Sequence, residues 1–363
     1  MTSKERMMVA LQRGVPDRVP ATVHQWQPFH LDEYLGGASD LEAFRRFGLD
    51  ASLTRFPILP TRDPNWDIGV CETSAPPGER RFEVTVTTPC GTLENVVGQN
   101  PTTTWNVTHL VKRPDDLELV DRFLPVPVLD REAVRRAYDD LGDDGIMRGF
   151  VFGDQGGCWQ HACCLAGTVE MITAATDSPD WVHAFMEALW RKKERFIAEN
   201  LDGAAYDLIE TGGGAASSTV IGPRYYREFC LPYDRRMHDA LHAIGHRVVY
   251  HTCGGMMPIL ELLAENGCDA SETLTPPSMG GDARPAELKR QVGDRLALVG
   301  GLDQNSVLEV GTPADVREHV HSMFAAYGPG GGYVMSPCDH FFRVPTENLE
   351  AYAAAARECV YAQ

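Results

Sequence analysis

Short apolar runs alternate with longer amphipathic stretches along almost the whole chain. The apolar runs are rich in β-branched and aromatic residues, whereas the stretches between them repeat apolar positions with the spacing of a helix. This order is typical of βα units, in which helices connect parallel strands. It predicts eight strands, at residues 19–26, 51–56, 146–153, 204–212, 246–253, 268–274, 296–303 and 333–338.

One segment departs from this alternation. Residues 80–99, RRFEVTVTTPCGTLENVVGQ, alternate apolar and polar side chains with a period of two around a Pro-Cys-Gly turn. That period predicts an antiparallel hairpin, inserted after the second strand. No repeat of fixed period and no linker divides the chain. The simplest fold is therefore α/β, a single (β/α)8 TIM barrel over residues 1–363 with an N-terminal elaboration and the inserted hairpin.

Composition and charge narrow the class of protein. Hydrophobic residues make up 43% of the chain, and no apolar run approaches the ~18 residues that cross a bilayer. The charged N-terminus lacks a secretory apolar segment, so we expect a cytoplasmic protein whose ten cysteines are thiols or metal ligands. The net charge of -18 argues against a surface that binds nucleic acid or anionic membranes.

The expected fold fixes where chemistry belongs, because active sites of such barrels form at the carboxyl ends of the strands. In VVYHTC, His251 and Cys253 are two residues apart, so they point to the same face of a strand. Cys338 follows the last predicted strand. One imidazole and two thiolates are a donor set that leaves zinc a fourth, open position. By position alone, a zinc site and three ordinary buried side chains explain the pattern equally well.

Other polar residues follow the remaining strands. The candidates for proton transfer or substrate contact are Glu210, Asp154, Glu272 and Asp303. The candidates for a pocket wall that contacts a cofactor or substrate are His24, Gln25 and His340. Glu210 stands beside a run of glycines that would let backbone approach a ligand, so it is also a candidate for a displaceable fourth zinc ligand. For each acid, a solvated carboxylate at a strand end is the alternative.

Several segments together resemble the uroporphyrinogen decarboxylase superfamily. They are SKERMMVALQRGVPDRVP (3–20), HTCGG (251–255), GCDASETL (267–274), LALVGGLD (296–303) and GPGGGYVMSPCDHF (328–341). The resemblance covers essentially the whole chain and implies a (β/α)8 barrel. Its decarboxylases carry an arginine-rich strand of the type RQAGRY, where this chain has PATVHQWQPFH without arginine. Its corrinoid-dependent methyltransferases carry His-x-Cys followed much later by Cys, which corresponds here to His251, Cys253 and Cys338.

The resemblance therefore implies a zinc-dependent methyltransferase, more similar to the O-demethylase-like members than to the coenzyme M enzymes. Zinc would activate the atom that exchanges the methyl group between a small methylated substrate, or a thiol acceptor, and cobalamin on a partner corrinoid protein. The substrate (an aryl methyl ether, a methylamine, methanol or a thiol) and the direction of transfer stay open. The alternatives are a metal-independent tetrapyrrole decarboxylase and a non-catalytic zinc- or corrinoid-binding protein.

Overall fold

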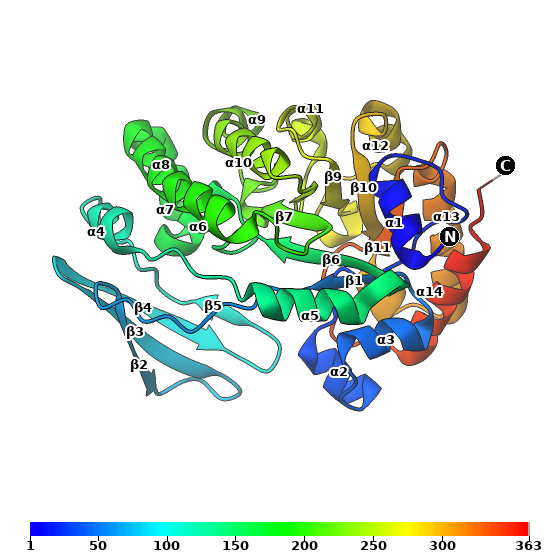
Figure 1. The fold of residues 1–363 in the computed structure, drawn as a ribbon, viewed down its shortest axis with the longest axis horizontal. Coiled ribbons are helices and arrows are strands. Elements are labelled where there is room, and N and C mark those ends of the chain that lie inside the picture. Colours follow the sequence, from blue (N-terminus) through cyan, green and yellow to red (C-terminus); the bar gives the residue numbers. More distant parts are fainter. Residues whose placement is uncertain (362–363) are drawn as a thin grey trace.

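The strands form two separate sheets in the computed structural model, which describes residues 1–361. They are β1 (Ala51–Thr54), β2 (Asp67–Thr73), β3 (Arg80–Thr88), β4 (Gly91–Gln99), β5 (Thr104–Asn106), β6 (Gly145–Phe150), β7 (Leu208–Gly212), β8 (Val248–His251), β9 (Ala270–Thr273), β10 (Ala297–Leu302) and β11 (Tyr333–Pro337). A curved parallel sheet has the order β1-β6-β7-β8-β9-β10-β11, and an antiparallel sheet beside it has the order β2-β3-β4-β5 (Figure 1).

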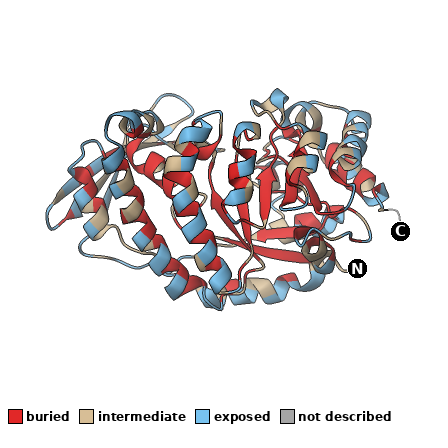
Figure 2. Cartoon of the chain, turned by 90° about the horizontal axis from the view of Figure 1, so that it is seen from above, coloured by how far each residue is buried: buried red, intermediate tan, exposed pale blue. Residues whose placement is uncertain are grey.

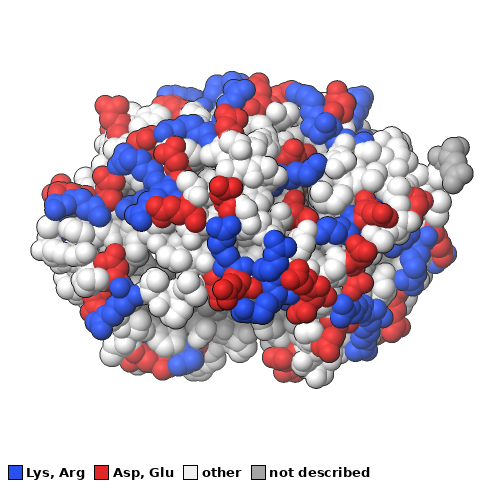
Figure 3. All heavy atoms as spheres, in the orientation of Figure 1, with Lys and Arg blue, Asp and Glu red and all other residues white. Residues whose placement is uncertain are grey.

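Helices follow most strands of the parallel sheet and cover its outer face (Figure 1). They are α1 (Ser3–Leu11), α2 (Pro28–Leu35), α3 (Asp40–Phe47), α4 (Asp116–Phe123), α5 (Arg131–Leu141), α6 (Cys158–Ala166), α7 (Thr168–Asp177), α8 (Pro179–Phe196), α9 (Pro223–Tyr225), α10 (Leu231–Ala243), α11 (Leu260–Glu265), α12 (Pro285–Val292), α13 (Pro313–Tyr327) and α14 (Thr346–Glu358). Within residues 1–361, no helix has the length and apolar character needed to cross a bilayer. On the face seen in Figure 3, basic and acidic side chains are interspersed.

Seven of the eight predicted strands are confirmed, with ends that differ by a few residues, but the strand at 19–26 is wrong. That segment forms one parallel bridge, between Ala21 and Met335. It touches both edges of the sheet, since the Thr22 N–H donates to Met335 O at 2.9 Å and the Asp50 N–H donates to Ala21 O at 2.8 Å. The ladder ends there because Pro20 has no N–H and the Asp50 carboxylate accepts the N–H of Ala21 at 2.9 Å. The observed parallel sheet thus has seven strands. In place of the expected eighth strand, residues 19–26 contribute only this bridge.

The hairpin predicted at 80–99 is confirmed as β3 and β4, which pair from Arg80 with Gln99 to Thr88 with Gly91. It is the centre of a larger sheet, because β2 pairs with β3 and β5 with β4. The sequence did not predict β2, most of whose side chains are exposed, or β5, which is three residues long.

Helix α1 closes the amino end of the curved sheet. Its Met7, Ala10 and Leu11 pack against side chains from the sheet interior, namely Ile146, Leu208, Val249, Ala270, Ala297, Val299 and Val334. Figure 2 shows these central strands as buried along their length. Two residues further along four of the strands, on the same face, stand Arg148, Glu210, His251 and Glu272. The apolar layer is therefore the floor of a buried polar layer.

Candidate active site

The buried polar layer is built around a single arginine. Arg148 and Glu210 are each 2% exposed, and Glu272 is 1% exposed. Arg148 Nη2 lies 2.6 Å from Glu210 Oε2 and 2.8 Å from each carboxylate oxygen of Glu272. One guanidinium nitrogen therefore donates to two carboxylates. The single positive charge of Arg148 balances the charge of only one of them.

The two glutamates respond to this arrangement in opposite ways. Burial opposes ionisation of Glu272, but Arg148 and His24 outweigh it and hold the pKa of Glu272 well below its usual value. Burial and the neighbouring charge of Glu272 raise the pKa of Glu210. Glu272 is thus the ionised member of the pair, and Glu210 is the member that keeps a proton more readily.

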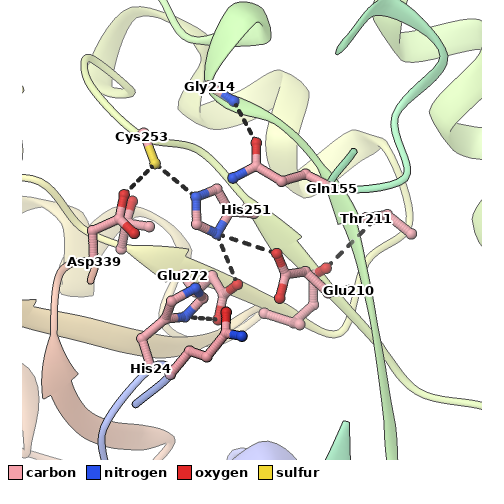
Figure 4. Close-up of polar contacts among 12 residues, drawn as sticks. His24, Gln155, Glu210, Thr211, Gly214, His251, Cys253, Glu272 and Asp339 are labelled. Atoms are coloured by element: carbon pink, nitrogen blue, oxygen red, sulfur yellow. Dashed lines mark hydrogen bonds and ion pairs between the residues drawn. The ribbon is translucent and has the colours of Figure 1, made fainter. Parts of the chain in front are cut away.

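His251 connects this layer to the mouth of the sheet. Its Nδ1 lies 3.0 Å from Glu272 Oε1 and its Nε2 lies 2.6 Å from Cys253 Sγ (Figure 4). Because Glu272 is an acceptor, Nδ1 carries a proton and Nε2 faces the thiol. Burial lowers the pKa of His251, but Cys253 and Glu272 outweigh it and raise that pKa well above the usual range. The surroundings of Nε2 therefore favour a cation there, either a proton or a metal ion.

A carboxylate completes the group on the outer side of His251. Cys253 Sγ donates to Asp339 Oδ2 at 2.9 Å, and donor atoms of His251, Cys253 and Asp339 all lie within 4.8 Å of one another. Asp339 in turn contacts His340 Nδ1 at 3.2 Å, and His340 Nε2 lies 3.1 Å from Gln25 Oε1. Burial opposes ionisation of Asp339, but His251 and His24 outweigh it and lower its pKa to about 2. Asp339 is therefore an anion that faces the thiol.

Cys338, the third residue of the predicted zinc set, lies beside this group. Its side chain is buried, and its Sγ points to Leu274 O at 3.8 Å. Burial raises the pKa of the Cys338 thiol, and the nearby Cys253 adds to the effect. The structure thus brings His251 and Cys253 together with Asp339, whereas ligation by Cys338 stays a prediction.

The donor chemistry of this group fits zinc. Imidazole nitrogen, thiolate sulfur and carboxylate oxygen are the ligands that zinc takes in proteins. Around a tetrahedral zinc ion, nitrogen and sulfur ligands lie roughly 3.5 Å apart. His251 Nε2 and Cys253 Sγ are 2.6 Å apart, so they would separate by roughly 1 Å on binding.

A cavity of about 270 Å³ opens next to these residues. One wall is aromatic and consists of Phe56, Phe150 and Phe152. The other lining residues are His24, Gln25, Val151, Gly153, Asp154, Gln155, Glu210 and His340. Five residues that the sequence singled out near the ends of four predicted strands therefore share one pocket, namely His24, Gln25, Asp154, Glu210 and His340.

Comparison with known proteins identifies the family. The family described as "Uroporphyrinogen decarboxylase (URO-D)" matches residues 2–359. The chain belongs to the uroporphyrinogen decarboxylase family. Within it, the chain is 28% identical over 248 residues to the methylated-thiol–coenzyme M methyltransferase of Methanosarcina mazei, a match of 68% of this chain and 61% of that protein. It is 26% identical over 369 residues to the uroporphyrinogen decarboxylase of Chromohalobacter salexigens, which covers 92% of this chain and 90% of that one.

A solved structure shows that the fold is shared. The methyltransferase from Methanosarcina mazei superposes with a TM-score of 0.66 at 18% identity, over 99% of both chains. The sequence relatives include both a methyltransferase and decarboxylases, and the solved structure shows the shared fold.

The predicted proton-transfer residues Asp154 and Asp303 make hydrogen bonds outside the buried polar layer. Asp154 accepts from Gln160 Nε2 at 2.7 Å and from Cys164 Sγ at 3.2 Å, at the rim of the cavity. Asp303 caps the segment that follows β10, where its carboxylate accepts the N–H groups of Asn305 and Ser306. Ser278 Oγ also donates to Asp303 at 2.6 Å, and Asp303 does not line the cavity.

The sequence predictions missed Arg148 and assigned no role to Asp339, which follows the last predicted strand. Arg148 had a signal, because it interrupts the predicted strand IMRGFVFG with a charge that a buried strand has to pair. Asp339 is adjacent to Cys338, and nothing in the sequence decides which of the two faces His251. Gly212 has φ +97, and a Cβ there would lie 2.6 Å from His251 O, so this glycine lets β7 pair closely with β8. The expected approach of the glycine run to a ligand stays a prediction.

Proposed function

We propose that this chain is a zinc-dependent methyltransferase that moves a methyl group between a small methylated substrate, or a thiol acceptor, and the cobalamin of a partner corrinoid protein. The observation that carries the proposal is the convergence of His251, Cys253 and Asp339 beside a small pocket. His251, Cys253 and Cys338 would hold zinc, and Asp339 would fill the fourth position until a substrate displaces it. The methyltransferase relative supports the reaction class, and an O-demethylase-like substrate is part of the proposal.

The chemistry follows from the side chains around the pocket. Bound zinc would supply Lewis acidity to the oxygen, nitrogen or sulfur atom that exchanges the methyl group. Phe56, Phe150 and Phe152 would hold the apolar body of the substrate and exclude water. Glu210 reaches the same cavity, and burial together with Glu272 raises its pKa, so this carboxyl can exchange a proton with the heteroatom that gains or loses the methyl group.

The charge of the pocket favours this function over tetrapyrrole decarboxylation. A porphyrinogen carries several carboxylates, which need cationic partners. No lysine or arginine is among the residues that line the cavity in the described part of the chain, and Asp154 and Glu210 are. The cavity of about 270 Å³ also lies just below the ~300–1,000 Å³ that ligand pockets usually occupy. Both features fit a small molecule without carboxylates.

Two measurements on purified protein test the proposal. Elemental analysis should find about one zinc per chain. Mixing the zinc-loaded protein with cob(I)alamin and a methyl donor, such as a methyl ether or a methylamine, should replace the cobalt(I) absorption by that of methylcobalt(III). For the reverse direction, a thiol should consume methylcobalamin. Absence of zinc, together with release of carbon dioxide from a porphyrinogen, would replace the proposal by the decarboxylase interpretation.

A further inference from the structure

The buried layer contains a second converging set of metal-type donors. Ligand atoms of His24, Glu210, His251 and Glu272 all lie within 4.8 Å of one another, and all four side chains are buried. Two imidazoles and two carboxylates would suit a divalent cation. The guanidinium of Arg148 already provides the positive charge between these carboxylates, however, because its Nη2 lies within 2.8 Å of oxygens from both glutamates. Arg148 is the resident cation of this layer.

Arg148 fixes the orientation of the Glu272 carboxylate. Both of its oxygens are 2.8 Å from Arg148 Nη2. Oε1 also accepts from His251 Nδ1 at 3.0 Å, and Oε2 lies 3.7 Å from His24 Nδ1. A carboxylate held in this way cannot turn away from His251 without losing its bonds to Arg148. The ring of His251 is thereby held with Nε2 directed at Cys253, 2.6 Å away.

We propose that Arg148 is a positioning residue for the metal centre, acting through Glu272 on the orientation of His251. The inference rests on the proposed zinc site, since it concerns how that site is presented. Arg148 makes no hydrogen bond to Cys253 or Asp339, so its contacts reach the metal centre only through Glu272 and the imidazole of His251. Groups that orient a metal-binding histidine contribute about 10- to 100-fold to metal affinity.

The experiment compares four variants with the wild-type chain. Arg148→Met removes the guanidinium, and Arg148→Lys keeps the charge but not the planar fork. Arg148→Met combined with Glu210→Gln leaves one carboxyl rather than two without the guanidinium, so it provides the test if the single variant fails to fold. Arg55→Met is the matched control, because Arg55 follows β1 and pairs with Asp40 at 2.6 Å, outside the layer.

The readouts are zinc affinity, measured by competition with a chelator, and the absorption spectrum of the cobalt(II)-loaded protein. Arg148→Met, alone or with Glu210→Gln, should lose about 10- to 100-fold in zinc affinity and change the cobalt spectrum as imidazole ligation is lost. Arg148→Lys should recover part of that loss, and Arg55→Met should match the wild type.

The results separate the two proposals. If the wild-type chain binds zinc and the folded Arg148 variants keep its affinity and cobalt spectrum, Arg148 does not position the centre and only this inference fails. If Arg148→Lys binds zinc no better than Arg148→Met at equal melting temperature, the charge does not carry the effect and the inference also fails. If the wild-type chain binds no zinc, the proposed function itself is wrong.

Discussion

Replacing either cysteine of the proposed zinc set by serine should remove most of the metal. Cys253 contacts His251 and Asp339, whereas Cys338 lies buried beside them with its thiol on a carbonyl oxygen. Zinc sites with four protein ligands bind with about 10–16 kcal/mol, or about 2.5–4 kcal/mol for each ligand. Loss of one thiolate should therefore weaken zinc binding by roughly 100- to 1,000-fold.

The variants Cys253→Ser, Cys338→Ser and Asp339→Asn separate the roles of these residues. Asp339→Asn keeps an oxygen in place and loses only the charge, so its zinc affinity should fall by about 10-fold. Cys268→Ser is the control, because Cys268 is also buried with its Sγ on a carbonyl oxygen, that of Leu263 at 3.6 Å. It should bind zinc as the wild type does.

The assay is competition with a zinc chelator, accompanied by elemental analysis and thermal unfolding. The large apolar core does not depend on the metal, so the melting temperatures of the metal-free variants should stay within about 5 °C of the wild type. Wild-type zinc affinity in both cysteine variants would refute the assignment. Loss of zinc in Asp339→Asn with full retention in Cys338→Ser would make Asp339, and not Cys338, the third ligand.

Two further predictions concern stability and substrate charge. Burial raises the pKa of Asp234 from 3.8 to about 7, although Tyr250 Oη donates to it at 2.7 Å. The folded chain therefore keeps a proton that the unfolded chain has released, so the contribution of Asp234 to the free energy of unfolding should fall by up to roughly 4 kcal/mol between about pH 4 and pH 7 and stay level above. Urea titrations of the wild type and of Asp234→Asn should differ by this fall, and identical profiles would contradict the argument. In calorimetry, a neutral or trimethylammonium ligand should bind the pocket at least about 10-fold more tightly than a carboxylate of equal size, because Asp154 and Glu210 line it, and equal affinities would contradict this.

Apolar periodicity predicted most of the parallel sheet because each of those strands is buried on both faces. The runs around Val248 and Leu298 contain enough consecutive apolar residues to exclude a solvated loop. The run at 19–26 has the same composition but fails as a strand for local reasons, since Pro20 lacks a donor and the Asp50 side chain competes for the N–H of Ala21. Such competition depends on a residue about thirty positions away, which periodicity cannot reveal.

The candidate site was predictable in part for the same geometric reason. Polar residues at strand ends could be assigned to one pocket because parallel strands end at one edge, and Glu210 and His340 do meet there. His24 and Gln25 join them from the segment at 19–26, although that segment is not a strand. Arg148 was missed because the predicted strand ran over 146–153 and placed it in the strand interior, whereas the observed strand ends at Phe150. The choice between Cys338 and Asp339 depends on the backbone after β11, where neighbouring side chains point in different directions.

The buried donor group and the outer donor group share His251, so a substitution in the buried group should affect metal binding in the outer group. His251 belongs both to the buried group with Glu210 and Glu272 and to the outer group with Cys253 and Asp339. A change in the buried charges therefore reaches the outer group through the imidazole, whose two nitrogens face opposite sides. A change at Asp339 reaches the buried group through charge alone, because the carboxylate makes its hydrogen bond with the thiol rather than with the ring. Metal affinity should consequently be more sensitive to substitutions in the hidden layer than its distance from the pocket suggests.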